Sequence, residues 1–166
     1  IGEARGLSGE DVFRGIVVGQ EVMCRIGLVA QRGIHAAGFH PTAVAGALAA
    51  AAAVAAALRT PEPVTVNALG IAGSMASGII EYLADGSWTK RLHAGWAAQS
   101  GLRAVLMAEA GFTGPKTVFE GEHGFFRAFS PSTAEDIELM TRDLGKSWFA
   151  KNLAFKPYAS GTMTQP

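Results

Sequence analysis

The chain has little cysteine and no excess of charge of either sign. Cys24 is the single cysteine, and fourteen Lys and Arg residues balance fourteen Asp and Glu residues in a chain of 166 residues. A single cysteine excludes an intrachain disulfide and is compatible with a reducing cytoplasm. The charge balance argues against nucleic acid or an anionic membrane as the partner. We therefore expect a cytoplasmic protein that binds neither of them.

Motifs that hold cofactors and metals are also absent from the sequence. It contains no Gly-rich phosphate loop ending in Lys-Ser or Lys-Thr, no dinucleotide fingerprint and no Gly-x-Ser-x-Gly elbow. The four histidines, His35, His40, His93 and His123, do not have the spacing of a zinc site. We expect no cofactor and no metal. A metal hydrolase that uses His35, His40 and His123 remains a rival hypothesis.

The sequence has no long run of strongly apolar residues. Residues 43–58 form the longest apolar run, but most of them are alanine, and about 18 to 20 strongly apolar residues are needed to span a bilayer. We expect a buried helix there. The amino end, Ile1-Gly2-Glu3-Ala4, lacks a methionine, a helix cap and a basic leader before an apolar core. This suggests a fragment of a longer polypeptide.

Apolar periodicity and capping residues predict a mainly α chain. Ser8, followed by Glu10 and Asp11, should cap the first helix, and Pro41 with Thr42 as a candidate cap should open the second. Residues 113–129 are too irregular for a long element. Helices are expected over about 9–31, 41–59, 64–84, 90–111 and 132–145, and a strand over 148–155.

The stretch 64–84 is rich in glycine, alanine and serine. A glycine inside a helix costs about 0.5 to 1 kcal/mol relative to alanine. Several of them indicate that close packing offsets the loss. We therefore expect this helix to form an antiparallel pair with the alanine-rich helix.

Basic side chains lie at the expected helix starts. Lys90 and His93 are three residues apart, which places them on one face near the first turn. Free backbone N–H groups and the helix dipole favour an anion there, so the expected ligand is a carboxylate or a phosphate. His40 precedes Pro41, and Lys156 follows the last expected element. Each residue alone is more often structural, but several cations that oppose helix dipoles together indicate an anion site.

Five short motifs resemble the MmgE/PrpD family, and they occur in the family's order over nearly the whole chain. They are Gly38-Phe39-His40-Pro41-Thr42, Ala68-Leu69-Gly70-Ile71-Ala72-Gly73-Ser74, Lys90-Arg91-Leu92-His93-Ala94-Gly95, Gly111-Phe112-Thr113-Gly114-Pro115 and Phe155-Lys156-Pro157-Tyr158.

The resemblance implies part of a cofactor-free lyase or isomerase that acts on di- or tricarboxylates, like 2-methylcitrate dehydratase, cis-aconitate decarboxylase or iminodisuccinate epimerase. It also implies a homodimer and a large helical domain followed by a smaller α+β lid domain. We therefore expect a partial helical domain over 1–150 and the junction with the lid over 151–166.

Carried over by motif, the resemblance assigns six site residues. It implies catalytic roles for His40, Lys90 and Lys156. It implies substrate binding by the remaining three, which are Thr42, Arg91 and His93. Further family residues, an Asp, a Thr and a His, would lie upstream of Ile1.

The small-residue helices also allow a different class of function. They are equally suited to a dimerisation surface, so a non-catalytic helical interaction module remains the alternative to an enzyme.

Overall fold

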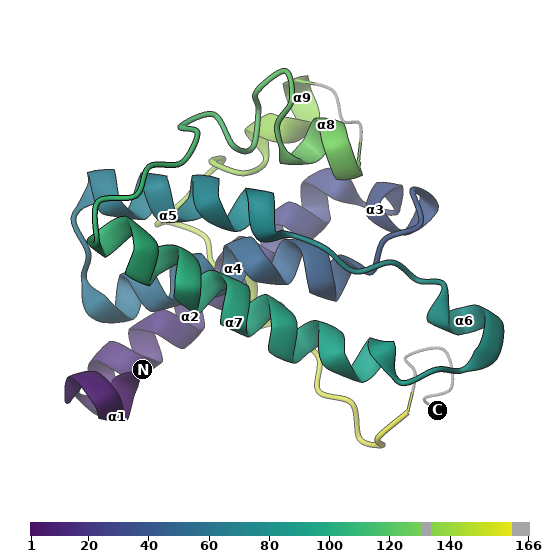
Figure 1. Ribbon diagram of the computed structural model, residues 1–166, viewed down its shortest axis with the longest axis horizontal. Helices are drawn as coiled ribbons and strands as arrows, with labels where there is room; N and C mark the ends of the chain where they lie inside the picture. Colours follow the sequence, from purple (N-terminus) through teal and green to yellow (C-terminus); the bar gives the residue numbers. More distant parts are fainter. Residues whose placement is uncertain (131–133, 161–166) are drawn as a thin grey trace.

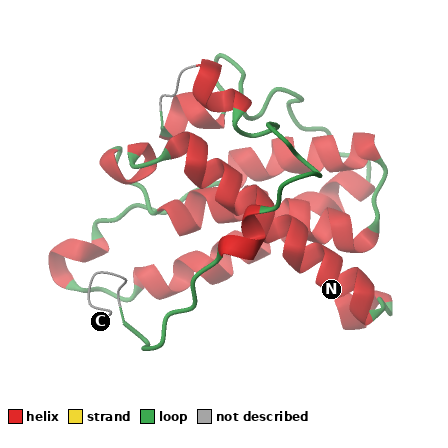
Figure 2. Ribbon diagram, turned by 180° about the vertical axis from the view of Figure 1, so that it is seen from behind, coloured by secondary structure: helices red, strands yellow, loops and turns green. Residues whose placement is uncertain are grey.

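The computed structural model describes residues 1–130 and 134–160, and helices account for the regular structure of this part of the chain (Figures 1 and 2). The mainly α fold is therefore confirmed. The helices are α1 (Gly2–Arg5), α2 (Gly9–Ala30), α3 (Gly33–Ala36), α4 (Pro41–Leu58), α5 (Glu62–Met75), α6 (Tyr82–Asp85), α7 (Thr89–Glu109), α8 (Phe125–Phe129), α9 (Ala134–Glu138) and the 3₁₀-helix η1 (Phe149–Asn152).

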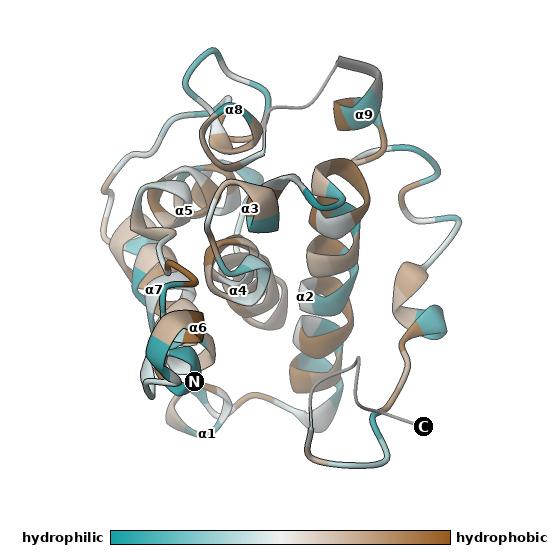
Figure 3. Ribbon diagram, turned by 90° about the vertical axis from the view of Figure 1, so that its right-hand side faces the viewer, coloured by the Kyte–Doolittle hydropathy of each residue, from teal (hydrophilic) through white to brown (hydrophobic). Residues whose placement is uncertain are grey.

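The alanine-rich helix α4 is the centre of the fold. Viewed nearly end-on in Figure 3, it is surrounded by α2, α5 and α7, and its packing against α2 and α7 is the most extensive. The expected packing of the alanine-rich helix against the next helix is present, since α5 returns antiparallel along α4 (Figure 1). By length and composition alone α4 could cross a membrane. Ten of its residues are buried inside this bundle, as in the core helix of a globular domain.

Glycines of α2 and α7 allow these helices to approach α4 closely. A Cβ added at Gly101 of α7 would lie 2.5 Å from both the Cβ of Ala50 and the backbone nitrogen of Ala51. The sequence predicts that glycines of 64–84 allow close packing against the alanine-rich helix. For the glycines of α5 this prediction is wrong. Gly70 and Gly73 face the segment 114–118 instead. Close packing is thus confirmed as the use of the helix glycines, but against different partners.

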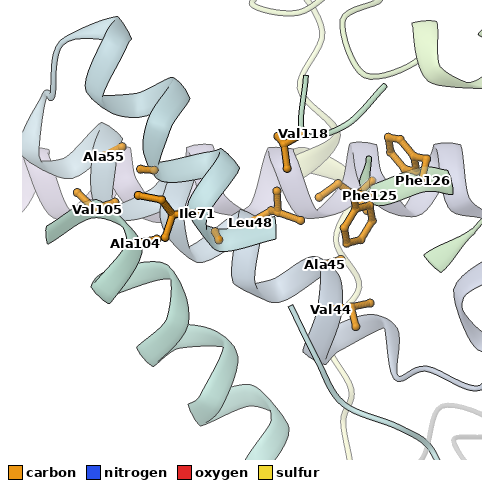
Figure 4. Packing of buried hydrophobic residues seen from close by; sticks show 14 of the residues in the cluster. Val44, Ala45, Leu48, Ala55, Ile71, Ala104, Val105, Val118, Phe125 and Phe126 are labelled. Atoms are coloured by element: carbon orange, nitrogen blue, oxygen red, sulfur yellow. The ribbon is translucent and has the colours of Figure 1, made fainter. Parts of the chain in front are cut away.

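Larger apolar side chains fill the core between α4, α5 and the segment that follows α7. Ile71 and Leu48 lie between the main helices, and Val118, Phe125 and Phe126 cover them from the segment that follows α7 (Figure 4). Each of these side chains is at most 7% exposed. The irregular stretch 113–129, which contains the five-residue helix α8, therefore belongs to the core.

The first helix begins as the sequence predicts. The Ser8 hydroxyl accepts a hydrogen bond from the Asp11 backbone nitrogen at 3.2 Å, and the Asp11 carboxylate accepts one from the Ser8 nitrogen at 3.3 Å. Hydrogen bonds from Ser8, Arg14 and Arg59 hold the pKa of Asp11 well below its ordinary value. This capping box fixes the start of α2 at Gly9 and ties it to the end of α4 through Arg59.

The helix expected over 64–84 is interrupted. α5 ends at Met75, and the chain runs extended until the short helix α6 begins at Tyr82. Gly78 has a φ of +132°, which other residues rarely adopt, and a Cβ there would lie 2.5 Å from the Cβ of Ala43. The stretch 76–81 therefore cannot continue the helix, and Phe39 and Ile79 form an isolated antiparallel bridge instead.

The carboxyl-terminal predictions need two corrections. The helix expected over 132–145 ends at Glu138, and its expected cap, Ser132 and Thr133, lies outside the described residues. The strand expected over 148–155 is wrong, because η1 occupies its centre. Both differences have the same cause, since Glu21 and Arg25 of α2 bind the backbone of this segment.

Arg25 and Glu21 form a buried polar cluster that holds the segment 139–150 against α2. The two side chains are 1% and 2% exposed and form an ion pair of 2.8 Å. The Arg25 guanidinium also donates to the carbonyl oxygens of Leu139, Met140, Arg142 and Ser147 at 2.9 to 3.3 Å. The second Glu21 oxygen accepts the Ala150 backbone N–H at 3.1 Å. Carbonyls that point at a guanidinium are not available to continue a helix.

Candidate functional site

The site lies at the amino-terminal ends of α4 and α7, where the extended stretch 76–81 passes between them. His40 is the cap residue of α4. Its backbone nitrogen donates to the carbonyl of Gly78 at 2.9 Å, and the Ile80 nitrogen donates to the carbonyl of Gly38 at 3.0 Å. These two hydrogen bonds hold His40 beside the segment that leads into α6.

His40 and His93 form a hydrogen-bonded pair. Their Nδ1 atoms are 3.0 Å apart, and His93 is 7% exposed. At that distance one Nδ1 must donate and the other must accept, so the neutral pair holds a single proton between the two Nδ1 atoms. The Nε2 of the donor ring then carries a lone pair and the Nε2 of the acceptor ring carries a proton. A neutral pair of this kind presents one base and one donor.

Tyr82 connects the imidazole pair to Lys90. Its ring meets His40 and His93 in edge-on contacts, with centroid separations of 5.8 and 5.7 Å. The Lys90 ammonium lies 5.8 Å from the centroid of the same ring, which is within the range of a cation–π interaction. Three groups from α4 and α7 therefore meet around one aromatic side chain of α6.

Tyr82 lines two hollows. The larger one, which we call the His93 hollow, has a volume of about 590 Å³. The smaller one, the cationic hollow, has a volume of about 310 Å³. The His93 hollow is lined by Ile79, Glu81, Tyr82, Asp85, Leu92, His93 and Trp96 among others. The cationic hollow is lined by Tyr82, Leu83, Gly86, Ser87, Trp88, Lys90 and Arg91.

The electrostatics of the site keep His40 neutral. Burial lowers the pKa of His40 below its ordinary value of 6.5, and electrostatic interactions with His93, Lys90 and His35 lower that pKa further. An imidazole with a lowered pKa is uncharged at neutral pH and can exchange a proton. A bound anion would oppose these effects and raise the pKa.

The structure brings together some of the predicted site residues. His40, Lys90 and His93 meet at Tyr82, and Arg91 stacks on Trp88 with its guanidinium carbon 4.8 Å from a ring centroid. The expected start of a helix at Lys90 is confirmed, because α7 begins at Thr89. The roles of these residues in binding and catalysis remain predictions.

Thr42 and Lys156 lie elsewhere. Thr42 is exposed and lines a groove between α2, α4 and α7 with Ala49, Ala97 and other small residues. It does not cap α4, because His40 occupies that position. Lys156 is exposed in the segment after η1, and no described hydrogen bond, ion pair or ring contact joins it to His40 or Lys90. Its part in the site therefore remains a prediction.

Sequence reasoning missed Tyr82. It assigned residues 64–84 to one continuous helix, in which Tyr82 is an ordinary apolar position near the end. The signal was the Ser77-Gly78 step, because a glycine that breaks the helix turns the following residues back toward α7.

The rival metal site lacks a suitable set of side chains. His123 lines a third hollow, of about 520 Å³, beside α5 and α8, away from the His40 and His93 pair. In residues 1–130 and 134–160 no three His, Cys, Asp or Glu side chains are grouped so that they could hold a metal ion.

Comparison with known proteins identifies the family. The profile of the MmgE/PrpD N-terminal domain matches residues 1–138. The chain belongs to the MmgE/PrpD family. The resemblance seen in the sequence motifs is thereby confirmed, and the helical bundle around α4 belongs to the amino-terminal domain of this family.

Curated relatives of the chain are enzymes of the lyase type. It is 33% identical over 159 residues to a cis-aconitate decarboxylase-like protein of Aspergillus oryzae, an alignment that covers 92% of this chain and 33% of the relative. It is 31% identical over 167 residues to the cis-aconitate decarboxylase of Aspergillus terreus, with 95% and 33% covered. The human cis-aconitate decarboxylase is 33% identical over 131 residues, with 76% and 26% covered. The chain spans about a third of the length of the first two of these relatives.

Proposed function

We propose that this chain is part of a cofactor-free lyase that decarboxylates a tricarboxylate of the cis-aconitate type. The observation that carries the proposal is the meeting of two imidazoles and an ammonium group around Tyr82, beside two hollows. The curated relatives support decarboxylation ahead of the 2-methylcitrate dehydration expected from the sequence, because the three reported above carry the name cis-aconitate decarboxylase or a name derived from it.

The cationic hollow suits the carboxylates of such a substrate. Lys90 and Arg91 line it, and α7 begins one residue before Lys90. The ammonium, the guanidinium and the first turn of α7 all favour negative charge there. Lys156 would add another cation if the segment after η1 turns toward the hollow in the whole protein.

The imidazole pair suits the proton transfer that follows loss of carbon dioxide. The substrate carries a carbon–carbon double bond one carbon away from the departing carboxylate. When the C–C bond to that carboxylate breaks, the carboxylate leaves as CO₂ and the electron pair of the broken bond forms a new double bond. The electrons of the old double bond move to the carbon beside a remaining carboxylate. That carbon takes one proton, so a trianion and a proton give a dianion and CO₂.

His40 and His93 can supply this proton. His40 is uncharged in the free protein, but a bound trianion favours the protonated form of the pair. The imidazolium then donates to the carbanion and returns to the neutral pair. Proton transfer of this kind contributes about 100- to 10,000-fold in rate, and cations placed beside the developing charge contribute about 3 to 4 kcal/mol for each well-placed donor.

Replacing Lys90 tests the proposal directly. In the full-length protein, Lys90→Met should reduce turnover of cis-aconitate by about 100- to 1,000-fold and leave the helical circular dichroism spectrum unchanged. Lys116→Met is the matched control, because Lys116 is an exposed lysine outside both hollows. Full activity of Lys90→Met would remove Lys90 from the mechanism.

Calorimetry separates the enzyme from the alternative of a non-catalytic interaction module. That alternative has support in the large apolar side chains exposed around the His93 hollow, such as Ile79 and Leu92 at 61% and 59% exposure. Titration of the full-length protein with citrate should release heat that is lost in Lys90→Met. A pure interaction module would give no heat with either protein. A homodimer in the cytoplasm is part of the same proposal, and sedimentation velocity tests the dimer.

A further inference from the structure

The ring of Tyr82 contacts His40, His93 and Lys90. Tyr82 is 8% exposed and belongs to α6. His40 caps α4, and Lys90 and His93 belong to α7. Neither sequence motifs nor the family resemblance assigns Tyr82 a role. Among the described residues no hydrogen-bond partner is seen for the Tyr82 hydroxyl, and the hydroxyl is not a fully buried, unpaired polar group. The contacts to the three site residues are made by the ring.

We propose that Tyr82 is the positioning residue of this site, whose aromatic ring sets the imidazole pair and the Lys90 ammonium at fixed separations and divides the His93 hollow from the cationic hollow. This inference rests on the proposed function for its kinetic consequences, but its structural consequence can be measured without turnover.

The geometry of the three ring contacts supports this role. The Tyr82 ring stands at 77° to the His40 ring and at 68° to the His93 ring, the edge-on arrangement that aromatic pairs prefer. His40 and His93 are in turn joined at their Nδ1 atoms, with their own centroids 5.1 Å apart. A triangle of three rings restrains the orientation of each member, so that the free nitrogens of the pair keep one direction.

The Lys90 ammonium depends on the same ring. Lys90 is exposed, and its ammonium group stands on a flexible stem. The ammonium contacts the ring of Tyr82. The face of the ring attracts the ammonium. The ring that contacts His93 therefore also holds a cation at the cationic hollow.

The edge-on contact with Tyr82 also covers part of the His40 ring. The charged and titratable groups that act on His40 are His93 and Lys90 of α7 and His35 of α3, while Glu81 and Asp85 line the hollow beside His93. Removing the ring would hydrate the pair, and loss of burial should raise the pKa of His40 toward its ordinary value. The pH at which the pair titrates therefore reports on the ring.

Two substitutions separate the ring from the hydroxyl. Tyr82→Phe keeps all three ring contacts, so kcat and the imidazole titration should remain as in the wild-type protein. Tyr82→Leu removes the ring, so kcat should fall by about 100-fold, the effect of a displacement of about 1 Å in a catalytic group. KM should change less, because a flexible lysine can still reach a carboxylate.

The pH dependence gives a readout that a merely structural residue would not change. In the full-length protein with ¹³C-labelled histidine, the NMR titration of the pair should move to higher pH in Tyr82→Leu and stay in place in Tyr82→Phe. If the imidazolium is the proton donor, the fall of kcat/KM at high pH should move in the same direction. Tyr82→Met, which fills the space without a ring, should behave like Tyr82→Leu and replaces it if that variant does not fold.

The outcomes distinguish this inference from the proposed function. Wild-type kcat and an unshifted titration in a folded Tyr82→Leu or Tyr82→Met protein would overturn the role of Tyr82 alone. Loss of kcat in Tyr82→Phe would assign the role to the hydroxyl and overturn the role of the ring. A wild-type protein without turnover of cis-aconitate would overturn the proposed function, while the histidine titration would still test Tyr82.

Discussion

Two polar clusters of this protein differ in how completely their groups are paired. In the Arg25 cluster a guanidinium meets one carboxylate and four carbonyl oxygens. In the His40 cluster two imidazoles share one hydrogen bond, and a hollow opens beside them. The first arrangement is closed to solvent, since its two side chains are 1% and 2% exposed, and it holds two segments together. The second leaves ring nitrogens available for chemistry, so burial of polar groups by itself does not mark a site.

The comparison predicts that the His40 cluster can be damaged without loss of the fold. In the full-length protein, His40→Asn should lower kcat by about 100- to 10,000-fold, the contribution of a proton-transfer group. The Tm should change little, because an asparagine can still occupy the cap of α4.

The control for His40→Asn is the same substitution at His123, which lies outside both hollows. His123→Asn should keep wild-type turnover. Equal losses in the two variants, or a wild-type rate in His40→Asn, would contradict the division of roles between the clusters.

The Arg25 cluster should show the reverse behaviour. Arg25→Met should lower the free energy of unfolding by about 3 to 5 kcal/mol, because Glu21 stays buried as an unpaired charge. Urea unfolding followed by circular dichroism measures this loss.

A double variant sharpens the role of the carbonyl groups. Glu21→Met combined with Arg25→Met removes both charges, and such replacements are often neutral for an isolated buried pair. Here we expect the double variant to remain less stable than the wild-type protein, because the carbonyls of residues 139, 140, 142 and 147 lose their donor. Recovery of full stability would show that these hydrogen bonds contribute nothing.

The smallest expected effect is a dependence of stability on pH near 6. Because the pKa of His40 is lowered in the folded state, its contribution to stability is present above about 6.5, the ordinary pKa of histidine, and is lost as the pH falls below that value. Urea midpoints measured between pH 5 and 8 should therefore decline on the acid side.

The same series in His40→Asn provides the comparison. The decline should be weaker in that variant, since the titrating group is gone. An identical decline in both proteins would assign the effect to other groups and remove His40 from the account of acid stability.

Much of the bundle could be predicted from the sequence. The Ser8 cap, the Pro41 start and the start of α7 at Lys90 rest on local rules of helix ends, and the structure has them within one residue. The failures at 76–81 and 139–150 have another origin. There the backbone bonds to residues far away in the chain, Gly38 in the first case and Arg25 in the second, and no local pattern announces such partners.

The candidate site could be predicted only in part, because local motifs name residues but do not show which of them meet. Motifs named His40, Lys90 and His93, but their contact depends on how α4 and α7 cross. Tyr82 enters the site only because α5 ends at Met75 and the stretch that contains Gly78 leads the chain back into α6.

The sequence by itself determined the helical class, the starts of α2, α4 and α7 and the family, because capping, periodicity and short motifs act over a few neighbouring residues. The tertiary structure decided which glycines meet α4, which carbonyls Arg25 binds and which imidazoles share a proton. Those pairings join residues as much as 122 positions apart, and only the packing of the bundle fixes distances of that kind.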